Sequence, residues 1–181
     1  MVTIIVGKTA SGKDSICKKL IALYNYKRIV TYTSRPKRKG EKDGVAYHFI
    51  DKEDFLEKIK EDFFAEWKSY ETVDGTWYYG TALSELENTE ENTLLIMTPQ
   101  GYRDICKKLK NKPKCIYIYA NNKTIQERLI FRGDDKEEAE RRLKHDNEDF
   151  KDFEYEADKI FYNNSYTKLN ELVERIHHFI K

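Results

Sequence analysis

The chain has 181 residues, a length typical of one compact domain, so two independent domains are not expected. Its 33 Lys and Arg residues against 32 Asp and Glu residues leave a formal net charge of +1, which argues against a nucleic-acid-binding arm or an acidic tail. With 39% hydrophobic and 13% aromatic residues the chain can build a core, and 36% charged residues indicate an ionic surface or a polar cleft rather than disorder.

Short apolar runs alternate with amphipathic segments along the chain. The apolar runs predict strands at residues 2–6, 28–33, 93–97, 114–119 and 159–162. Helical spacing of apolar side chains predicts helices at residues 14–24, 51–60, 125–132, 136–144 and 166–180. Asp51 is placed as a helix cap, and Gly133 is placed as a helix stop. This alternation is typical of an α/β fold in which helices cover a parallel sheet.

The cellular compartment is predicted from apolar runs and cysteines. The first apolar run, residues 2–6, is far shorter than the roughly 18 residues of a membrane span, and it has neither the basic flank nor the cleavage site of a signal peptide. Cys17, Cys106 and Cys115 are odd in number and widely spaced, without a second Cys or a His at metal-ligand spacing. We therefore expect a soluble, cytoplasmic protein with reduced thiols and no membrane attachment.

The segment between the first strand and the first helix fits the pattern G-x-x-x-x-G-K. It reads Gly7-Lys8-Thr9-Ala10-Ser11-Gly12-Lys13, and it has the preceding strand and following helix that the motif requires. The glycines let backbone N–H groups wrap a phosphate, the helix N-terminus adds partial positive charge, and Lys13 reaches the β- and γ-phosphates. The motif predicts a nucleotide-binding loop that extends to Asp14 and Ser15.

Position 14 departs from this motif. The Ser or Thr that follows the lysine, and whose hydroxyl binds magnesium, is replaced by Asp14, with Ser15 next. In one interpretation Asp14 simply opens the helix, where the dipole favours a carboxylate. In the other, Asp14 and Ser15 form a magnesium site, with the carboxylate binding the metal directly or through water. Both interpretations remain open at this point.

A basic and aromatic segment follows, and it is more specific than a charged loop. Residues 31–49 read TYTSRPKRKGEKDGVAYHF, with Glu66-Trp67 and Tyr78-Tyr79-Gly80-Thr81 downstream. In motif content and order the chain resembles the guanylate kinase family, from the phosphate loop to Asn163.

The resemblance implies a P-loop NTPase-type parallel sheet core flanked by helices, with an inserted lobe that binds the monophosphate and a helical lid. In this single domain the core would comprise residues 1–30, 83–122 and 146–181, the lobe residues 31–82, and the lid residues 123–145.

The same resemblance assigns an acceptor-phosphate site. Arg35 and Arg38 match the family's two arginines on the acceptor phosphate, and Tyr47 and Tyr79 match the tyrosines that bond it. The assignment suits the chemistry, because planar guanidinium forks fit a dianionic phosphate and phenols donate without adding charge.

A guanine-reading group is implied further along. Glu66 matches the carboxylate that accepts from N1–H and the exocyclic amine of guanine, a donor pair that adenine lacks. Thr31 and Thr81 match hydroxyl positions near the base, and Gly80 and Thr98 complete the implied GMP site.

The charged segment at residues 123–145 carries the implied lid arginines. Arg128, Arg132 and Arg142 match the arginines that would clamp the transferring phosphoryl group, although Arg141 adjoins the last of them. With Lys13 and Arg35 they form the expected catalytic set, because phosphoryl transfer needs cations that neutralise developing charge. The implied reaction is in-line transfer from ATP, with Mg²⁺ as cofactor, to GMP or dGMP.

Two features depart from the family. Aligned through Gln100-Gly101, Ile96 and Thr98 stand where the family's strand has aspartates, so we hypothesise that Asp14 replaces the lost charge. The stretch between Glu66 and Tyr79 is also longer than in family members, with a hairpin turn expected at Asp74-Gly75.

Other functions stay open beside guanylate kinase activity. The Gly-Lys-Asp loop also resembles ribose 1,5-bisphosphate phosphokinases and other deoxynucleotide kinases, which would leave Glu66 unexplained. A third possibility is an inactive guanylate-kinase-like module that binds a phosphorylated peptide, but such modules lack the loop lysine that Lys13 supplies. Small nucleotides are the expected partners, without nucleic acid or membrane, for a monomer or homodimer.

Overall fold

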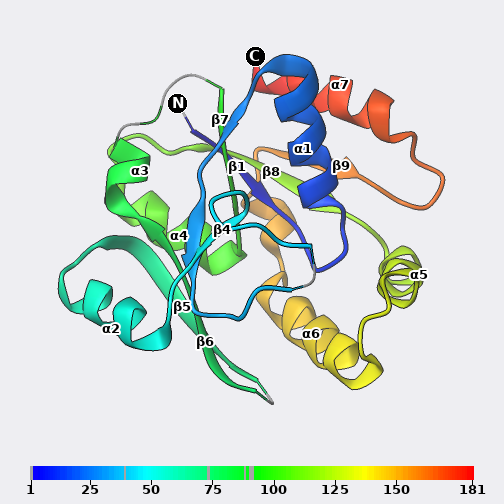
Figure 1. Cartoon of the computed structure of the whole chain (residues 1–181). Helices are drawn as coiled ribbons and strands as arrows, with labels where there is room; N and C mark the ends of the chain where they lie inside the picture. Colours follow the sequence, from blue (N-terminus) through cyan, green and yellow to red (C-terminus); the bar gives the residue numbers. More distant parts are fainter. Residues whose placement is uncertain (1, 39, 73, 88, 90–91) are drawn as a thin grey trace.

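Strands that are far apart in the sequence form a parallel sheet at the centre of the molecule (Figure 1). The computed structural model describes residues 2–38, 40–72, 74–87, 89 and 92–181. The sheet order is β2 (Lys27–Arg28), β7 (Thr93–Met97), β1 (Val2–Val6), β8 (Lys114–Tyr119) and β9 (Lys159–Tyr162). All neighbouring pairs are parallel, and β1 is buried along its whole length. Burial on both faces explains why the three central strands, β7, β1 and β8, are apolar runs, and the predicted α/β fold is confirmed.

Helices cover both faces of the parallel sheet. On one face α1 (Lys13–Tyr24) and α7 (Leu169–Ile180) pack in a cluster that includes Ile5, whereas Ile4 and Val6 belong to the cluster on the other face. That second face is covered by α4 (Pro99–Lys108) and the 3₁₀ helix η1 (Phe153–Tyr155). The alternation of β1 side chains thus supplies both halves of the core.

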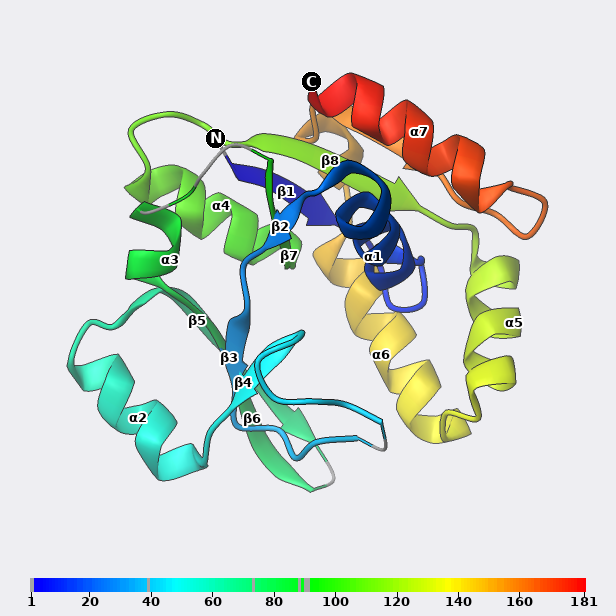
Figure 2. The same ribbon diagram turned by 45° about the horizontal axis from the view of Figure 1, so that its top comes forward.

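A second sheet lies beside the first, on the side of α2 (Lys52–Lys60) (Figure 2). Its order is β4 (Tyr47–Phe49), β3 (Thr31–Thr33), β6 (Gly75–Ala82) and β5 (Phe64–Thr72), followed in the chain by α3 (Leu83–Glu87). Phe55 of α2 stacks on Phe64 with ring centroids 4.4 Å apart. The long β5–β6 hairpin gives this sheet a surface that faces the phosphate loop across the molecule.

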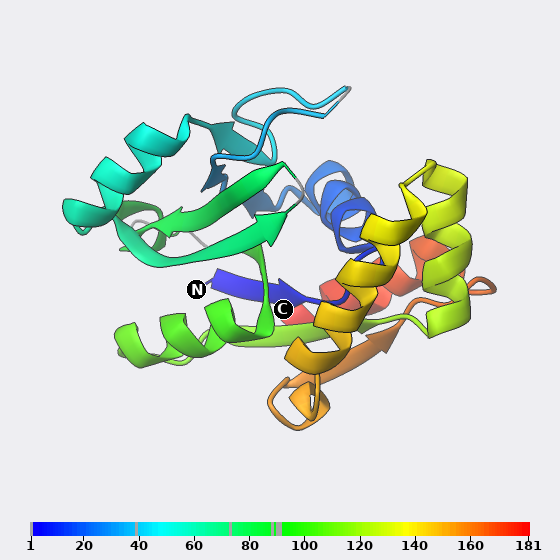
Figure 3. The ribbon, with the colours of Figure 1, turned by 90° about the horizontal axis from the view of Figure 1, so that it is seen from below.

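Two helices form an antiparallel pair at the other side of the phosphate loop (Figure 3). They are α5 (Asn122–Arg132) and α6 (Lys136–Asp149). Gly133 ends α5 in the left-handed conformation, with a φ of 73°, as the sequence predicts for a helix stop. Among the described residues, none of the helices has both the length and the apolar character that a bilayer crossing requires.

Several predicted boundaries are wrong, and each error has a local cause. The expected strand at residues 28–33 is split, because the chain leaves the parallel sheet after Arg28 and enters the second sheet at Thr31. The last helix begins at Leu169 rather than Tyr166, since a turn closed by a hydrogen bond from the Thr167 N–H to the Asn164 carbonyl precedes it. The hairpin turn expected at Asp74-Gly75 is shifted, because Gly75 is already the first residue of β6 and pairs with Thr72, while residue 73 is outside the described residues.

Candidate functional site

A cleft of about 340 Å³ lies between the carboxyl edge of the parallel sheet, the second sheet and α6. Most of the predicted site residues line it: Gly7, Thr9, Ala10, Lys13, Asp14, Thr31, Arg35, Arg38, Tyr47, Glu66, Tyr79, Gly80, Thr81, Thr98, Arg132 and Arg142. A second cavity, of about 330 Å³, is lined by Gly12, Ser15, Arg128 and Asn163 among others. Both cavities are lined by Lys13, Asp14 and Arg132. The phosphate loop therefore lies between the two cavities, and Lys13 borders each of them.

Tight backbone packing explains the two glycines of the phosphate loop. Gly12 has a φ of 96°, and a Cβ there would lie 2.3 Å from the Asn163 amide nitrogen. That amide donates to the Ser11 carbonyl at 2.8 Å and so fixes the loop to the end of β9. A Cβ on Gly7 would lie 2.5 Å from the Ile118 carbonyl oxygen. Both positions therefore require glycine, as the motif predicts.

Lys13 is folded back over the loop that it follows. Its Nζ donates to the carbonyl oxygens of Gly7, at 2.5 Å, and Lys8, at 2.8 Å. Burial lowers the pKa of Lys13, and the carboxylates of Asp14 and Asp146 oppose that shift. The ammonium group thus lies at the boundary of the two cavities, with carboxylates near it. Phosphate oxygens could replace its two carbonyl acceptors.

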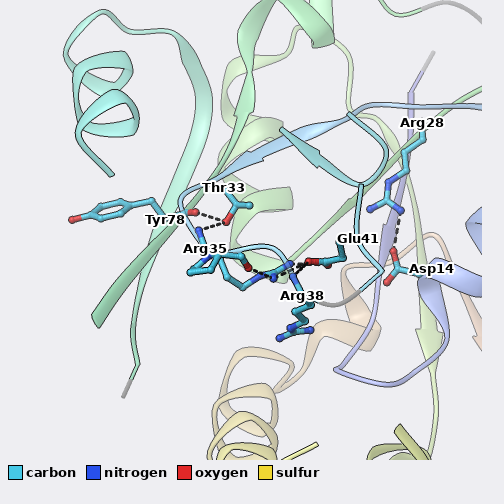
Figure 4. A network of polar contacts seen from close by, with 8 residues as sticks. Asp14, Arg28, Thr33, Arg35, Arg38, Glu41 and Tyr78 are labelled. Atoms are coloured by element: carbon cyan, nitrogen blue, oxygen red, sulfur yellow. Dashed lines mark hydrogen bonds and ion pairs between the residues drawn. The ribbon is translucent and has the colours of Figure 1, made fainter. Parts of the chain in front are cut away.

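Asp14 has a partner that the sequence did not reveal. In Figure 4 the Arg28 side chain extends from the end of β2 toward Asp14, and its Nη1 donates to the Asp14 Oδ1 at 2.9 Å. Asp14 also lies in the first turn of α1, as the helix-opening interpretation expects. In the sequence, the only feature that could have pointed to a role for Arg28 is its charge at the start of a predicted apolar strand. Among the described residues there is no group of three or more His, Cys, Asp or Glu side chains fit to hold a metal.

Arg35 is held in place by contacts within its own segment of the chain. It is only 4% exposed, and its two terminal nitrogens donate to the two carboxylate oxygens of Glu41 at 2.9 and 2.8 Å. Its backbone N–H donates to the Thr33 hydroxyl, which in turn donates to the Tyr78 carbonyl (Figure 4). The Glu41 carboxylate also accepts from the Arg38 N–H at 2.7 Å, so one acid organises the loop that carries both arginines.

Around these arginines the cleft concentrates positive charge and phenol groups. Burial and the nearby charge of Arg142 lower the pKa of Arg38, as expected where cations crowd together. The Tyr47 and Tyr79 rings meet edge to face at 5.8 Å, and burial raises the pKa of Tyr47 to about 12. Both features favour binding of an anion by guanidinium groups and neutral phenol donors.

The far end of the cleft carries the predicted base-reading group. Glu66 is partly buried, and its Oε1 accepts from the Thr81 hydroxyl at 2.6 Å. Burial raises the pKa of Glu66, and the Thr81 hydrogen bond opposes that shift. Gly80 packs closely, since a Cβ there would lie 2.8 Å from the Phe64 ring. Thr98 caps α4 by accepting from the Gly101 N–H at 3.2 Å.

The β5–β6 hairpin contributes further residues to the cleft, and these were missed in the sequence. Lys68, Tyr70, Thr72 and Trp77 all line it. Burial raises the pKa of Tyr70, whose side chain is hydrogen bonded to Thr98. The signal was present, because positions 66, 68, 70 and 72 alternate along one strand and so share one face.

The three predicted lid arginines have different surroundings. Arg128 donates to the Ala10 carbonyl at 3.1 Å and to the Asn163 carbonyl at 2.9 Å, which places it at the second cavity rather than the cleft. Arg132 pairs with Asp134. Arg142 lines the cleft, as does its neighbour Arg141. The site thus offers arginines on both sides of the loop.

A contact between α6 and the phosphate loop was also missed. The Asp146 Oδ2 accepts from the Thr9 N–H at 2.6 Å, and the Asn147 Oδ1 accepts from the Lys8 Nζ at 2.7 Å. Burial raises the pKa of Asp146, and the Thr9 N–H and the charge of Lys13 oppose that shift. A carboxylate therefore occupies one of the backbone donors of a loop built to bind anions.

The fold and the cleft define a class of protein. Phosphoryl transfer between two nucleotides needs two anion sites in line, with cations where the charge moves. The cleft brings the glycine-rich loop and Lys13 together with the tyrosines of the second sheet and the arginines of its β3–β4 loop, an arrangement that suits two such anion sites. The chain is a P-loop kinase of the nucleoside monophosphate kinase class.

Comparison with known proteins identifies the family within that class. The guanylate kinase family model matches residues 1–181. The guanylate kinase of Fusobacterium nucleatum is 34% identical, with 98% of this chain and 96% of that protein covered. The guanylate kinase of Wolinella succinogenes is 36% identical, with 80% of this chain and 68% of that protein covered. The crystal structure of guanylate kinase from Anaplasma phagocytophilum is similar with a TM-score of 0.70 at 26% identity, over 99% of this chain and 84% of that one. The chain belongs to the guanylate kinase family, which confirms the resemblance seen in its sequence.

Proposed function

We propose that the chain transfers the γ-phosphoryl group of ATP to GMP, and also to dGMP, and releases ADP and the diphosphate. One observation carries the proposal: the partly buried Glu66 carboxylate lies in the same cleft as Arg35 and the phosphate loop. One cleft then contains a group that can read the base, a site for the acceptor phosphate and the loop for the donor phosphates. A guanine nucleotide bound there would place its base at Glu66 and its phosphate near the loop.

The proposed mechanism uses positioning and charge. Arg35 and Arg38 bind the GMP phosphate with help from the Tyr47 and Tyr79 phenols, and an ionised phosphate oxygen attacks the γ-phosphorus of ATP in line. No general base is needed, because that oxygen carries no proton to remove. Lys13 and the lid arginines stabilise the charge that moves to the ADP leaving group.

Lid arginines act from two directions in this mechanism. Arg132 and Arg142 face the cleft, and Arg128 supports the loop from the second cavity. Closure of the lid over the cleft excludes water from the transferring group, which prevents hydrolysis of ATP.

Mg²⁺ fits the donors beside the phosphate loop. Mg²⁺ is bound in proteins by one or two carboxylates together with substrate phosphates and water. The Asp14 carboxylate is 64% exposed and lines both cavities, so it suits that role, whereas the exposed Ser15 lines only the second cavity. When bound, the ion neutralises phosphate charge during transfer.

Three segments divide the work in this proposal. Residues 31–82 form the acceptor lobe, residues 123–145 the lid, and the remaining residues the core. The three cysteines are all free thiols, which supports a cytoplasmic location beside the nucleotide pool. We propose that the active form is a monomer or a homodimer.

An ADP-release assay with ATP and Mg²⁺ tests the function. GMP, dGMP, AMP, CMP, UMP and ribose 1,5-bisphosphate are supplied as separate acceptors, and we expect turnover with GMP and dGMP. Preference for ribose 1,5-bisphosphate or a pyrimidine nucleotide would indicate one of the other kinase activities. ATP binding without turnover on any acceptor would contradict the proposal, and failure to bind ATP would favour a binding module.

Removal of the α6 carboxylate is expected to strengthen ATP binding. Asp146 holds the Thr9 N–H near Lys13, where an incoming phosphate must replace it. Asp146→Ala should therefore raise the affinity for metal-free ATP by about tenfold, a change of roughly 1.4 kcal/mol, measured by isothermal titration calorimetry. Asn147→Ala is the control, because it removes the neighbouring contact to Lys8 without removing a negative charge. Weaker ATP binding in Asp146→Ala would mean that this carboxylate supports the nucleotide instead of competing with it.

A further inference from the structure

Arg28 brings a desolvated positive charge to the nucleotide site. It is the last residue of β2, its side chain is 11% exposed, and it lines the cleft. Its Nη1 donates to the Asp14 Oδ1 at 2.9 Å (Figure 4). Its Nε is buried and has no hydrogen-bond partner among the described residues. This guanidinium group has lost much of its hydration, and its partners are the Asp14 carboxylate and the buried Cys17 thiol, to which its side chain is hydrogen bonded.

The stability of the fold does not account for this pair. The Asp14 side chain is 64% exposed, and exposed ion pairs contribute little to stability. Burial of a charged or polar group with an unpaired donor is unfavourable. An apolar residue at position 28 would pack against the sheet without this penalty, so the charge is better explained by the site.

The position of Asp14 creates the need for a countercharge. Asp14 follows Lys13 directly and lines both cavities, so its carboxylate lies beside the place where the donor phosphates bind. A negative charge there repels a polyphosphate, and the repulsion is strongest when no metal is bound. The charge of Arg28 acts on this same region, because it contributes a lowering of the pKa of Lys13 on one side and of Tyr47 on the other.

We propose that Arg28 is a positioning residue for the donor nucleotide: it holds Asp14 and cancels its charge, so that ATP can bind beside this carboxylate. One oxygen of Asp14 is held by Arg28, and the other is left for the Mg²⁺ that accompanies ATP. At position 14, where the common motif has a hydroxyl group, this chain therefore has a carboxylate that is paired with an arginine. This inference rests on the proposed function, because it requires a donor nucleotide at the loop.

The test is a double-mutant cycle on ATP binding without acceptor, measured by calorimetry in EDTA and in Mg²⁺. Arg28→Met should weaken metal-free ATP binding by about tenfold or more, because an uncompensated carboxylate then faces the phosphates. Mg²⁺ should recover part of this loss, since it neutralises the same carboxylate. Arg28→Lys, which keeps the charge, should stay within about threefold of the wild type in affinity.

The second half of the cycle removes the carboxylate. In the Asp14→Asn background, Arg28→Met should change metal-free ATP binding by less than about twofold, because no repulsion remains to be cancelled. Lys110→Met is the matched control, since it removes one positive charge at an exposed site outside both cavities. Thermal unfolding of each variant checks that the fold is retained.

Each other outcome overturns the inference. An equal loss of ATP affinity from Arg28→Met in both backgrounds would show that Arg28 acts on the nucleotide or on the fold, not through Asp14. A loss of GMP affinity larger than the loss of ATP affinity would assign Arg28 to the acceptor phosphate. Wild-type protein that binds no ATP would overturn the proposed function as well, whereas normal ATP binding in Arg28→Met would overturn only the role of Arg28.

Discussion

Lys13→Ala is expected to reduce kcat by about 10²- to 10³-fold, the range seen when one preorganised charge is removed from a transition state. Lys13 lies at the boundary of the two cavities, and its Nζ donates to the Gly7 and Lys8 carbonyl oxygens, which phosphate oxygens can replace. The affinity for GMP should change by less than about twofold, since the acceptor phosphate is held by other cations. ADP release gives kcat, and calorimetry with GMP alone gives the acceptor affinity.

Lys8→Ala is the control for this prediction. Lys8 belongs to the same loop, but its Nζ donates to Asn147 and it lines neither cavity. We expect a change of less than about tenfold in kcat, because Lys8 does not reach the transferring group. Turnover near the wild-type rate in Lys13→Ala would contradict the mechanism, because the lid arginines or another group would then stabilise the leaving-group charge without Lys13.

Glu66→Gln is expected to lower kcat/KM for GMP by about 10²-fold or more, because a buried polar group that has lost its matched partner is strongly unfavourable. The carboxylate offers two acceptor oxygens, of which one already accepts from Thr81. An amide would present a donor to the donors of guanine. The measurement is steady-state kinetics with GMP and AMP, and discrimination between them should fall.

The same carboxyl group predicts a pH dependence. Burial raises the pKa of Glu66, so its ionised form is lost at a less acidic pH than that of an exposed glutamate. Guanine reading needs the ionised form, and KM for GMP should therefore rise as the pH falls through that raised pKa. Glu66→Gln should remove this rise from the profile.

Glu71 provides the matched control on the same strand. It is exposed on the opposite face of β5 and its carboxylate accepts from the Thr76 hydroxyl, outside the cleft. Glu71→Gln should leave both the GMP preference and its pH profile unchanged. If Glu66→Gln behaved like Glu71→Gln, the base would have to be recognised by another group.

The parts of the fold that were predicted correctly are those with a local cause. The strands at residues 93–97 and 114–119 were predicted with their observed boundaries, because burial on both faces leaves an apolar run. The edge strand at residues 159–162 was also predicted with its observed boundaries, although both of its ends are exposed. The phosphate loop was found because its glycines are required by contacts with Ile118 and Asn163 that hardly any other residue permits. The run at residues 28–33 was not resolved, since β propensity does not tell which sheet a strand joins.

The missed parts of the site depend on contacts between distant segments. Asp14 was recognised as unusual, but its pairing with Arg28 follows from β2 lying beside β7, which a single sequence does not reveal. Asp146 reaches Thr9 across most of the chain in the same way. Both residues look like ordinary surface charges in their own segments. The hypothesis that Asp14 supplies the charge absent at Ile96 remains a prediction, now joined to its partner Arg28.

The long β5–β6 hairpin makes the proposed acceptor site optically distinct from the rest of the molecule. The chain has two tryptophans, Trp67 and Trp77, and both lie on this hairpin, Trp77 at the wall of the cleft and Trp67 44% exposed. Excitation of indole therefore samples the acceptor lobe, while the core and the lid contribute no indole signal. Acceptor binding can be followed in the unlabelled protein by emission, and movement of α5 and α6 would need a tryptophan or dye introduced there.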